Sequence, residues 1–169
     1  MNTIIAYLTP LYLTDRAVRS PEAESLLDLA RRVVHHGGGA HSVELIAFGP
    51  AGWEQDVAAG VRLRVLPIAY RDGHPLDVLS WDLPLALARA DVVHIHQANT
   101  RTGEMGLLLA KLHRKPVCLS VQGRAGGLGA SIDFSDLADC LIELGDPAED
   151  GPRLARLYRR LADGLEEAA

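Results

Sequence analysis

The sequence contains only two cysteines and no apolar run long enough to span a bilayer. Its longest apolar runs, such as Leu107–Ala110, are far shorter than the roughly 20 residues of a transmembrane helix. No charged region precedes the first apolar segment at the N-terminus, so we expect no signal peptide. Cys118 and Cys140 lie in strand-like apolar runs, where we expect reduced core residues. Together these features predict a soluble cytoplasmic protein.

Basic residues are not concentrated either. The 169 residues carry 17 Lys and Arg against 22 Asp and Glu, which gives a net charge of −5. No long basic run is present, and this argues against a nucleic-acid-binding protein, because such proteins usually show a basic face. The length fits one domain, and the hydrophobic content of 48% gives that domain a core to bury.

The common motifs of nucleotide binding and nucleophilic catalysis are missing. Neither G-x-G-x-x-G after the first strand nor Gly-Lys-Ser/Thr is present, which makes a different nucleotide-binding Rossmann protein the weakest interpretation. The sequence has no Gly-x-Ser-x-Gly elbow, and neither cysteine lies at a strand rim beside a histidine. No acidic cluster follows the first strand, so a phospho-accepting receiver domain is not indicated.

Apolar runs alternate with segments of helical period, which predicts a parallel β-sheet with helices on both faces. Right-handed crossovers give a doubly wound, Rossmann-like α/β fold with strand order 3-2-1-4-5-6. In the third strand Arg62 and Arg64 alternate with apolar residues, so we expect it near an edge. The six expected strands are Ile4–Thr9, Val43–Phe48, Val61–Val65, Asp91–His96, Val117–Val121 and Cys140–Leu144.

Four helices are expected between and after these strands. The first follows a loop, Leu11–Arg19, and begins at Ser20-Pro21, with serine as N-cap and proline at the first helical position. It ends at His35-His36, where the helix dipole favours them, before three glycines. The others are Asp77–Arg89, Arg101–His113 and a last helix that opens at Gly151-Pro152.

Ligands of doubly wound sheets bind beyond the carboxyl ends of the strands. The fourth strand ends in His94-Ile95-His96-Gln97, and alternation places both histidines on one face, with His96 nearer the rim. We expect His94 to be a buried, hydrogen-bonded core residue, and His96 and Gln97 to face a cleft. Two histidines at this spacing can bind a metal, but nothing nearby supplies a third ligand, so we predict no metal site.

A glycine-rich segment follows the fifth strand. Backbone N–H groups in such a loop can approach an anion, and Arg124 adds a positive charge beside Gln122 and Gly123. A ligand-contacting loop and a loop without ligand contact both remain open here.

Further cleft residues are expected at two other strand ends. They are Tyr12 and Arg16 after the first strand and Asn99 after the fourth. A solvated connection is the alternative for the segment that holds Tyr12 and Arg16.

Three segments carry distinctive strand sequences: Ala90–Gln97, Lys115–Gly123 and Gly60–Pro67. They resemble the A-D-V-V-H-x-H, x-P-V-V-x-T-x-H-G and G-V-x-V-x-R-L-P strands of family 4 glycosyltransferase N-terminal domains, which have the GT-B fold. Val43–Gly49 and Leu137–Asp139 also fall in the expected places. The resemblance covers roughly residues 1–146.

This resemblance implies an acceptor-side domain that would work with a C-terminal donor domain. The donor domain binds a nucleotide sugar through residues that include a Glu-x7-Glu motif, and transfer needs no metal. The segment Leu157–Leu161 looks like the family's last helix, which packs back on the N-terminal domain. We therefore expect a Rossmann-like domain at 1–146, its C-terminal helix at 151–169, and a donor domain missing between Asp146 and Gly151.

Two departures from the family pattern bear on catalysis. The loop Leu11–Arg19 lacks the family's paired glycines, and Gln122 replaces the histidine of the H-G pair. Glutamine can hydrogen-bond a sugar hydroxyl but cannot accept a proton as histidine can. We therefore expect the chain to be inactive or incomplete alone, with no catalytic residue identified and no cofactor held by the chain itself.

Two functions remain open. The first is an acceptor-binding half-domain for a sugar-containing or small-molecule acceptor, completed by a donor-domain protein and lined by His96, Gln97, Gln122, Gly123 and Arg124. The second is a non-catalytic binding module, related to glycosyltransferases, that self-associates through an exposed apolar face.

Overall fold

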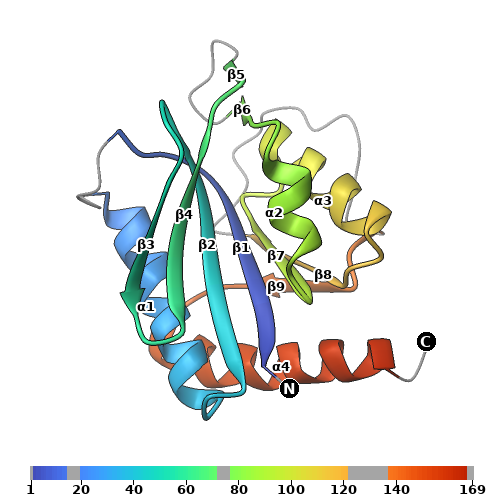
Figure 1. Cartoon of the computed structure of the whole chain (residues 1–169). Helices are drawn as coiled ribbons and strands as arrows, with labels where there is room; N and C mark the ends of the chain where they lie inside the picture. Colours follow the sequence, from blue (N-terminus) through green and yellow to red (C-terminus); the bar gives the residue numbers. More distant parts are fainter. Residues whose placement is uncertain (1, 15–19, 72–76, 122–136, 167–169) are drawn as a thin grey trace.

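The computed structural model describes residues 2–14, 20–71, 77–121 and 137–166. Over these residues a seven-stranded sheet runs through the middle of the molecule and carries helices on both faces (Figure 1). Its strands are β1 (Thr3–Tyr12), β2 (His41–Gly49), β3 (Trp53–Ala58), β4 (Val61–Pro67), β7 (Val92–His96), β8 (Val117–Val121) and β9 (Cys140–Glu143). A separate pair is formed by β5 (Tyr70–Arg71) and β6 (Val78–Leu79). The helices are α1 (Pro21–His36), α2 (Leu83–Ala88), α3 (Arg101–Leu112) and α4 (Pro147–Glu166).

The order of the large sheet is β3-β4-β2-β1-β7-β8-β9. The six strands from β4 to β9 pair in parallel, in the order 3-2-1-4-5-6 predicted from the sequence. The doubly wound, Rossmann-like fold is therefore confirmed. Successive parallel strands are added on one side of β1 up to β4 and on its other side from β7 onward, which places a topological switch point at the carboxyl ends of β1 and β7.

The edge of the sheet differs from the prediction, because the antiparallel strand β3 lies outside β4. A two-residue turn with Gly60 at a φ of +74° joins the two strands. The arginines of β4 form ion pairs with β3 and do not indicate an edge position. Arg62 Nε lies 2.8 Å from Asp56 Oδ1, and Arg64 Nη2 lies 2.7 Å from Glu54 Oε1. Acidic residues of β3 thus account for the arginines on β4.

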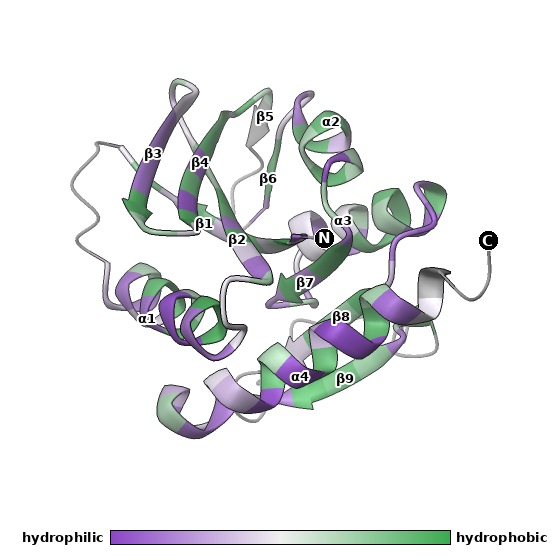
Figure 2. Ribbon diagram, turned by 60° about the horizontal axis from the view of Figure 1, so that its bottom comes forward, coloured by the Kyte–Doolittle hydropathy of each residue, from purple (hydrophilic) through white to green (hydrophobic). Residues whose placement is uncertain are grey.

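Two apolar cores fill the space between the sheet and its helices. On one face α1 and α4 pack against inward residues such as Ile5, Leu45 and Val92. On the other face α2 and α3 pack against Ala6, Ile46 and other residues of opposite alternation. In Figure 2, α1 and α4 carry both hydrophobic and hydrophilic residues, as expected of helices with one side on a core and one side in solvent. Because side chains alternate along a strand, successive residues contribute to opposite cores.

Two helices begin as predicted, at side-chain caps. Ser20 Oγ accepts a hydrogen bond from Ala23 N at 3.1 Å, and Thr100 Oγ1 accepts one from Gly103 N at 3.1 Å. These contacts satisfy N–H groups that have no partner inside the helix, which explains why α1 and α3 begin at these residues.

Several predicted boundaries were wrong. The first strand continues to Tyr12 instead of ending at Thr9, so the expected loop Leu11–Arg19 begins later. The expected helix Asp77–Arg89 is shortened to α2, because Val78 and Leu79 form β6 and Thr102 Oγ1 bonds to Val78 O at 2.6 Å.

The last helix and one cysteine also differ from expectation. Helix α4 begins at Pro147 rather than Gly151, since Asp146 Oδ1 accepts from Ala148 N at 2.8 Å and Asp150 Oδ2 accepts from Gly145 N at 2.7 Å. These carboxylates cap the helix earlier than its apolar stripe suggests.

Both cysteines are free thiols, but Cys140 is half-buried and only Cys118 is a core residue.

Helix α4 is held on the sheet by polar as well as apolar contacts. The side chains of Leu154 and Tyr158 are fully buried. His41 of β2 donates a hydrogen bond from Nε2 to the Ala155 carbonyl at 2.9 Å.

Within the described part of the chain, no helix combines the length and the apolar character needed to cross a membrane.

Candidate functional site

The carboxyl end of β7 makes an abrupt turn into α3. Gln97 has a φ of +61°, in the left-handed region that side chains other than glycine seldom adopt. The turn is held by Thr100, whose hydroxyl donates to the Gln97 carbonyl at 3.0 Å. Non-glycine residues in this conformation cost free energy and are concentrated at functional sites. The backbone conformation of Gln97 therefore makes the end of β7 a candidate functional site.

His96 occupies the last position of β7 and has one ring nitrogen without a partner. The side chain is only 2% exposed, and its Nδ1 lies 2.9 Å from Ser120 Oγ on β8. Its Nε2 is buried and makes no hydrogen bond to any described residue. Whichever tautomer is present, Ser120 occupies Nδ1 and leaves Nε2 as the open group.

Gln97 adds a second open polar atom beside His96. Its Oε1 is buried and has no hydrogen-bond partner among the described residues, although the residue as a whole is half-buried. Leaving a buried acceptor without a partner costs about 1–3 kcal/mol. Two such atoms on consecutive residues at the switch point of the sheet are therefore the strongest indication of a ligand site.

A polar network lies deeper, between the sheet and α4. His94 is fully buried and its Nδ1 hydrogen-bonds the Tyr158 hydroxyl, which confirms the prediction of a bonded core histidine. The Tyr158 hydroxyl lies 3.2 Å from the Tyr7 hydroxyl of β1. The rings of His94 and His96 stack, as expected for residues on one face, with centroids 4.2 Å apart. This network connects α4 to the strand that carries the site.

Burial controls the protonation of these groups. It lowers the pKa of His96 to about 3, and it holds the pKa of His94 well below its ordinary value, an effect to which the neighbouring His96 adds. Burial also raises the pKa of both Tyr7 and Tyr158. All four side chains are therefore neutral near pH 7. At that pH His96 offers a hydrogen bond but is a weak base, since a general base works best with a pKa near the operating pH.

The two buried histidines make stability depend on pH. Unfolded, each histidine titrates near 6.5, whereas in the fold each pKa is lower, so the unfolded chain binds more protons below pH 6.5. Stability is complete above pH 6.5 and is lost as pH falls toward the folded values. We expect urea unfolding between pH 6.5 and 5 to lose up to about 1.4 kcal/mol per pH unit for each histidine.

A variant pair checks this origin. His96→Gln removes one titrating group and should roughly halve the slope, whereas His36→Gln, at an exposed position on α1, should leave it unchanged. Equal stability of the unmodified protein at pH 7 and pH 5 would show that the buried histidines are not the cause.

The other predicted site residues lie at the same edge or outside the described residues. Tyr12 is half-buried at the carboxyl end of β1, where it pairs with Phe48 of β2. Asn99 is exposed in the turn before α3. Arg16, Gln122, Gly123 and Arg124 fall outside the described residues. The described residues of the predicted site thus share the carboxyl edge of the sheet.

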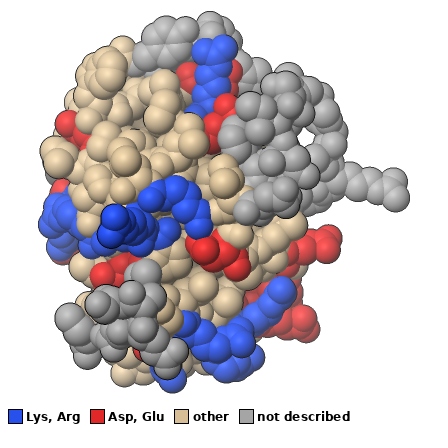
Figure 3. Space-filling view, turned by 90° about the vertical axis from the view of Figure 1, so that its right-hand side faces the viewer, with Lys and Arg blue, Asp and Glu red and all other residues tan. Residues whose placement is uncertain are grey.

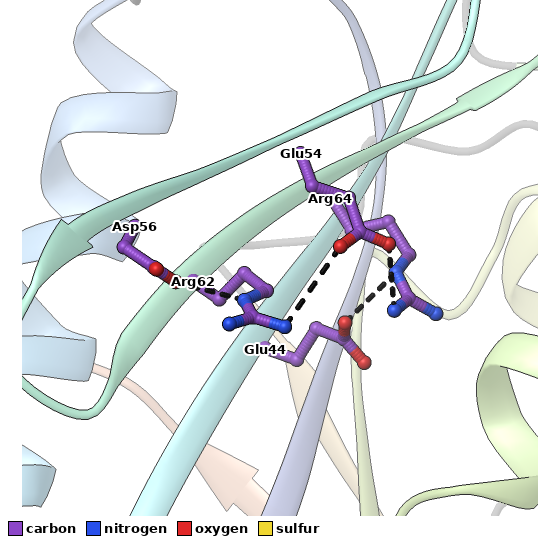
Figure 4. A network of polar contacts seen from close by, with 5 residues as sticks. All are labelled: Glu44, Glu54, Asp56, Arg62 and Arg64. Carbon is purple, nitrogen blue, oxygen red and sulfur yellow. Dashed lines mark hydrogen bonds and ion pairs between the residues drawn. The ribbon is translucent and has the colours of Figure 1, made fainter.

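A groove lies at the opposite edge of the sheet, around the amino ends of β2 and β4. It has a volume of about 670 Å³ and is lined by residues that include Ser42, Glu44, Arg62 and Arg89. Figure 4 shows why we do not assign it as the site: its charged residues Glu44, Asp56 and Arg62 are each in an ion pair. Glu44 Oε1 lies 2.8 Å from Arg64 Nε, and Arg62 lies close to both Asp56 and Glu54.

The ion pairs beside this groove are structural contacts that join β2, β3 and β4. Burial raises the pKa of Glu44, while Arg64 and then Arg89 act in the opposite direction. The arginines thus offset part of the cost of burying the carboxylate. In the described ranges, no three His, Cys, Asp or Glu side chains come together in a way that would hold a metal ion.

Comparison with known proteins identifies one family. The sequence profile described as "Glycosyl transferase 4-like domain" matches residues 23–166. No curated protein matches the chain. The matched region runs from α1 to the end of α4 and so includes β7, the Gln97 turn and the helix that buries Tyr158.

Proposed function

Because the chain belongs to the glycosyl transferase 4-like domain family, we propose that it is the acceptor-binding half of a sugar-transfer system. A glycosyltransferase-related function follows from the family; the acceptor role is our proposal. The observation that carries it is the pair of buried, unpartnered atoms at the end of β7, His96 Nε2 and Gln97 Oε1. Sugar hydroxyls both donate and accept, so one hydroxyl can bond either group.

The electrostatics of the site support binding rather than proton transfer. His96 is neutral with a pKa of about 3, and burial prevents it from carrying charge. Gln97 has no titratable group. We therefore propose that these residues orient a sugar-containing or small-molecule acceptor, while a second domain outside the 169 residues binds the nucleotide sugar. The described residues of the site hold no charged side chain that would fix the donor's phosphates.

Helix α4 has a supporting role in this proposal. Its Tyr158 hydroxyl bonds His94, and the His94 ring stacks on the His96 ring. We propose that residues 1–146 and the helix within residues 151–169 act as one unit, in which α4 fixes the histidine pair beneath the acceptor. We further propose that Tyr12, Asn99, Arg16, Gln122, Gly123 and Arg124 complete the acceptor site.

A binding experiment tests the acceptor role. The protein, with 15N-labelled histidine rings and amide side chains, is titrated with a panel of methyl hexosides and followed by NMR. We expect the largest shifts at His96 Nε2. Gln97→Gly, which removes the amide but suits a φ of +61°, should weaken binding about tenfold, the size of one hydrogen bond of about 1.4 kcal/mol.

Ser42→Ala serves as the matched control, because Ser42 lines the groove at the amino ends of the strands. This variant should bind the hexosides as the unmodified protein does. Shifts confined to residues of that groove, with His96 unaffected, would contradict the proposed acceptor site.

The alternative is a non-catalytic module that self-associates. It is favoured by exposed apolar side chains of helix α3, among them Leu108 and Leu112. Self-association by itself is compatible with the proposed acceptor site, since the apolar side chains lie on a helix and that site lies at strand ends.

A further inference from the structure

Helix α3 carries an exposed apolar stripe on the side away from the sheet. The stripe consists of Met105, Leu108 and Leu112, which are 38%, 50% and 76% exposed. Their spacings of three and four residues place them in one row along the helix. The opposite side of α3, with Gly106, Leu107 and Ala110, is buried in the core. The stripe is therefore an additional surface and not a part of the core.

Charged groups divide the stripe into two ends of opposite character. Glu104 lies beside its first turn, where Asp77 also approaches and pairs with Arg101 at 3.8 Å. Lys111 lies beside the last turn, where it pairs with Asp139 at 2.7 Å, and Arg114 and Lys115 follow the helix directly and leave this end with a net positive charge. Figure 3, which faces this side of the molecule, shows a broad area without charged side chains, with basic groups along part of its border.

We propose that two copies of this chain associate through the stripes of their α3 helices, packed antiparallel about a two-fold axis near Leu108. In this arrangement Leu108 meets its counterpart, and Met105 packs against Leu112 of the partner copy. Glu104 and Lys111 are seven residues apart on the same flank of the stripe, so each Glu104 lies beside Lys111 of the partner copy. One patch thus complements itself, as a two-fold interface requires.

Charge complementarity favours a second copy of the chain as the partner and favours the antiparallel orientation. Antiparallel packing brings the acidic end of one stripe to the basic end of the other, twice. Parallel packing would place Lys111, Arg114 and Lys115 of both copies together, which costs free energy through like-charge repulsion. A single helix stripe buries little area, so we expect a weak dimer with a Kd on the order of 10 µM.

Sedimentation analysis of the full chain over a concentration series tests the dimer. Leu108→Glu should abolish it, raising the Kd at least tenfold. Leu85→Glu is the matched control, because Leu85 is 72% exposed but lies on α2 in a groove lined by Trp53 and Arg89, toward β3 and β4. This variant should dimerise as the unmodified protein does.

A charge exchange tests the register. Glu104→Lys and Lys111→Glu should each weaken self-association several-fold, and a mixture of the two variants should form a heterodimer at least as tight as the unmodified homodimer. Since Lys111 also bonds Asp139 at 2.7 Å, a urea unfolding curve for each variant checks that its fold is intact.

Three results would overturn the proposal: a strict monomer at 500 µM, a dimer that survives Leu108→Glu, or binding of the monomeric chain to vesicles of anionic phospholipid through the same stripe. The surface lies on α3 and not at the strand ends. Loss of dimerisation with unchanged hexoside shifts at His96 would therefore separate this inference from the acceptor proposal.

Discussion

Tyr158→Ala is expected to lower the free energy of unfolding by about 3–5 kcal/mol, the range for truncating a large buried aromatic side chain. Tyr158 is fully buried among residues of α1, α4 and the sheet. Its ring contacts Tyr7 and His94, and its hydroxyl bonds both of them. The substitution leaves a cavity and two buried polar groups without this partner. Urea unfolding at pH 7.5 measures the change.

Tyr158→Phe separates the hydroxyl from the ring. It keeps the packing and removes only the hydroxyl with its hydrogen bonds to His94 and Tyr7, so we expect a loss of about 1–3 kcal/mol. Arg159→Ala, at the next and exposed position of α4, should change stability by less than about 0.5 kcal/mol. Equal stability of Tyr158→Ala and Arg159→Ala would mean that α4 does not pack on the sheet as described.

Gly103→Ala is expected to destabilise the protein by about 1–3 kcal/mol, although alanine normally stabilises a helix relative to glycine. A methyl group at this position would lie 2.7 Å from the Ala98 carbonyl oxygen and 2.9 Å from the Gln97 carbonyl oxygen. Both are backbone atoms, so the turn from β7 into α3 must move. The same variant should weaken hexoside binding, because Gln97 is part of that turn.

Gly164→Ala is the control for Gly103→Ala. Gly164 is exposed within α4, and nothing lies within 4 Å of an added methyl group. Here the helix propensity of alanine acts alone, and we expect a gain of about 0.5–1 kcal/mol. Thermal or urea unfolding of both variants measures the contrast. Two changes of the same sign would show that α3 does not approach the end of β7 closely.

Much of the fold follows from local sequence patterns. The six parallel strands are apolar runs, and right-handed crossovers allow few orders for them, which is why the order 3-2-1-4-5-6 was predictable. Strand β3 was not, because Glu54, Gln55 and Asp56 have no strand-like pattern of their own. They pair with β4 through a hairpin, and ion pairs with its arginines hold them there.

The placement of His94 and His96 on one face was predictable, but their hydrogen-bonding state was not. Alternation placed His94 and His96 on one face, and the position of His96 at the strand end indicated the rim. Tyr7 and Tyr158 are 151 residues apart, and no local pattern indicates that their hydroxyl groups meet. Whether His96 Nε2 finds a partner depends on packing among β1, β7, β8 and α4. Only the assembled structure shows that this buried atom has no hydrogen-bond partner among the described residues.

The central claim is that this chain supplies the acceptor side of a sugar transfer and needs a second domain for the donor. Its most direct test is a transfer assay with radiolabelled nucleotide sugars and the methyl hexosides, with and without a separately purified donor-domain protein from the same genomic neighbourhood. We predict labelled glycoside only in the mixture, and at least tenfold less of it with Gln97→Gly. Transfer by this chain alone would contradict the account, as would transfer in the mixture that Gln97→Gly leaves unchanged.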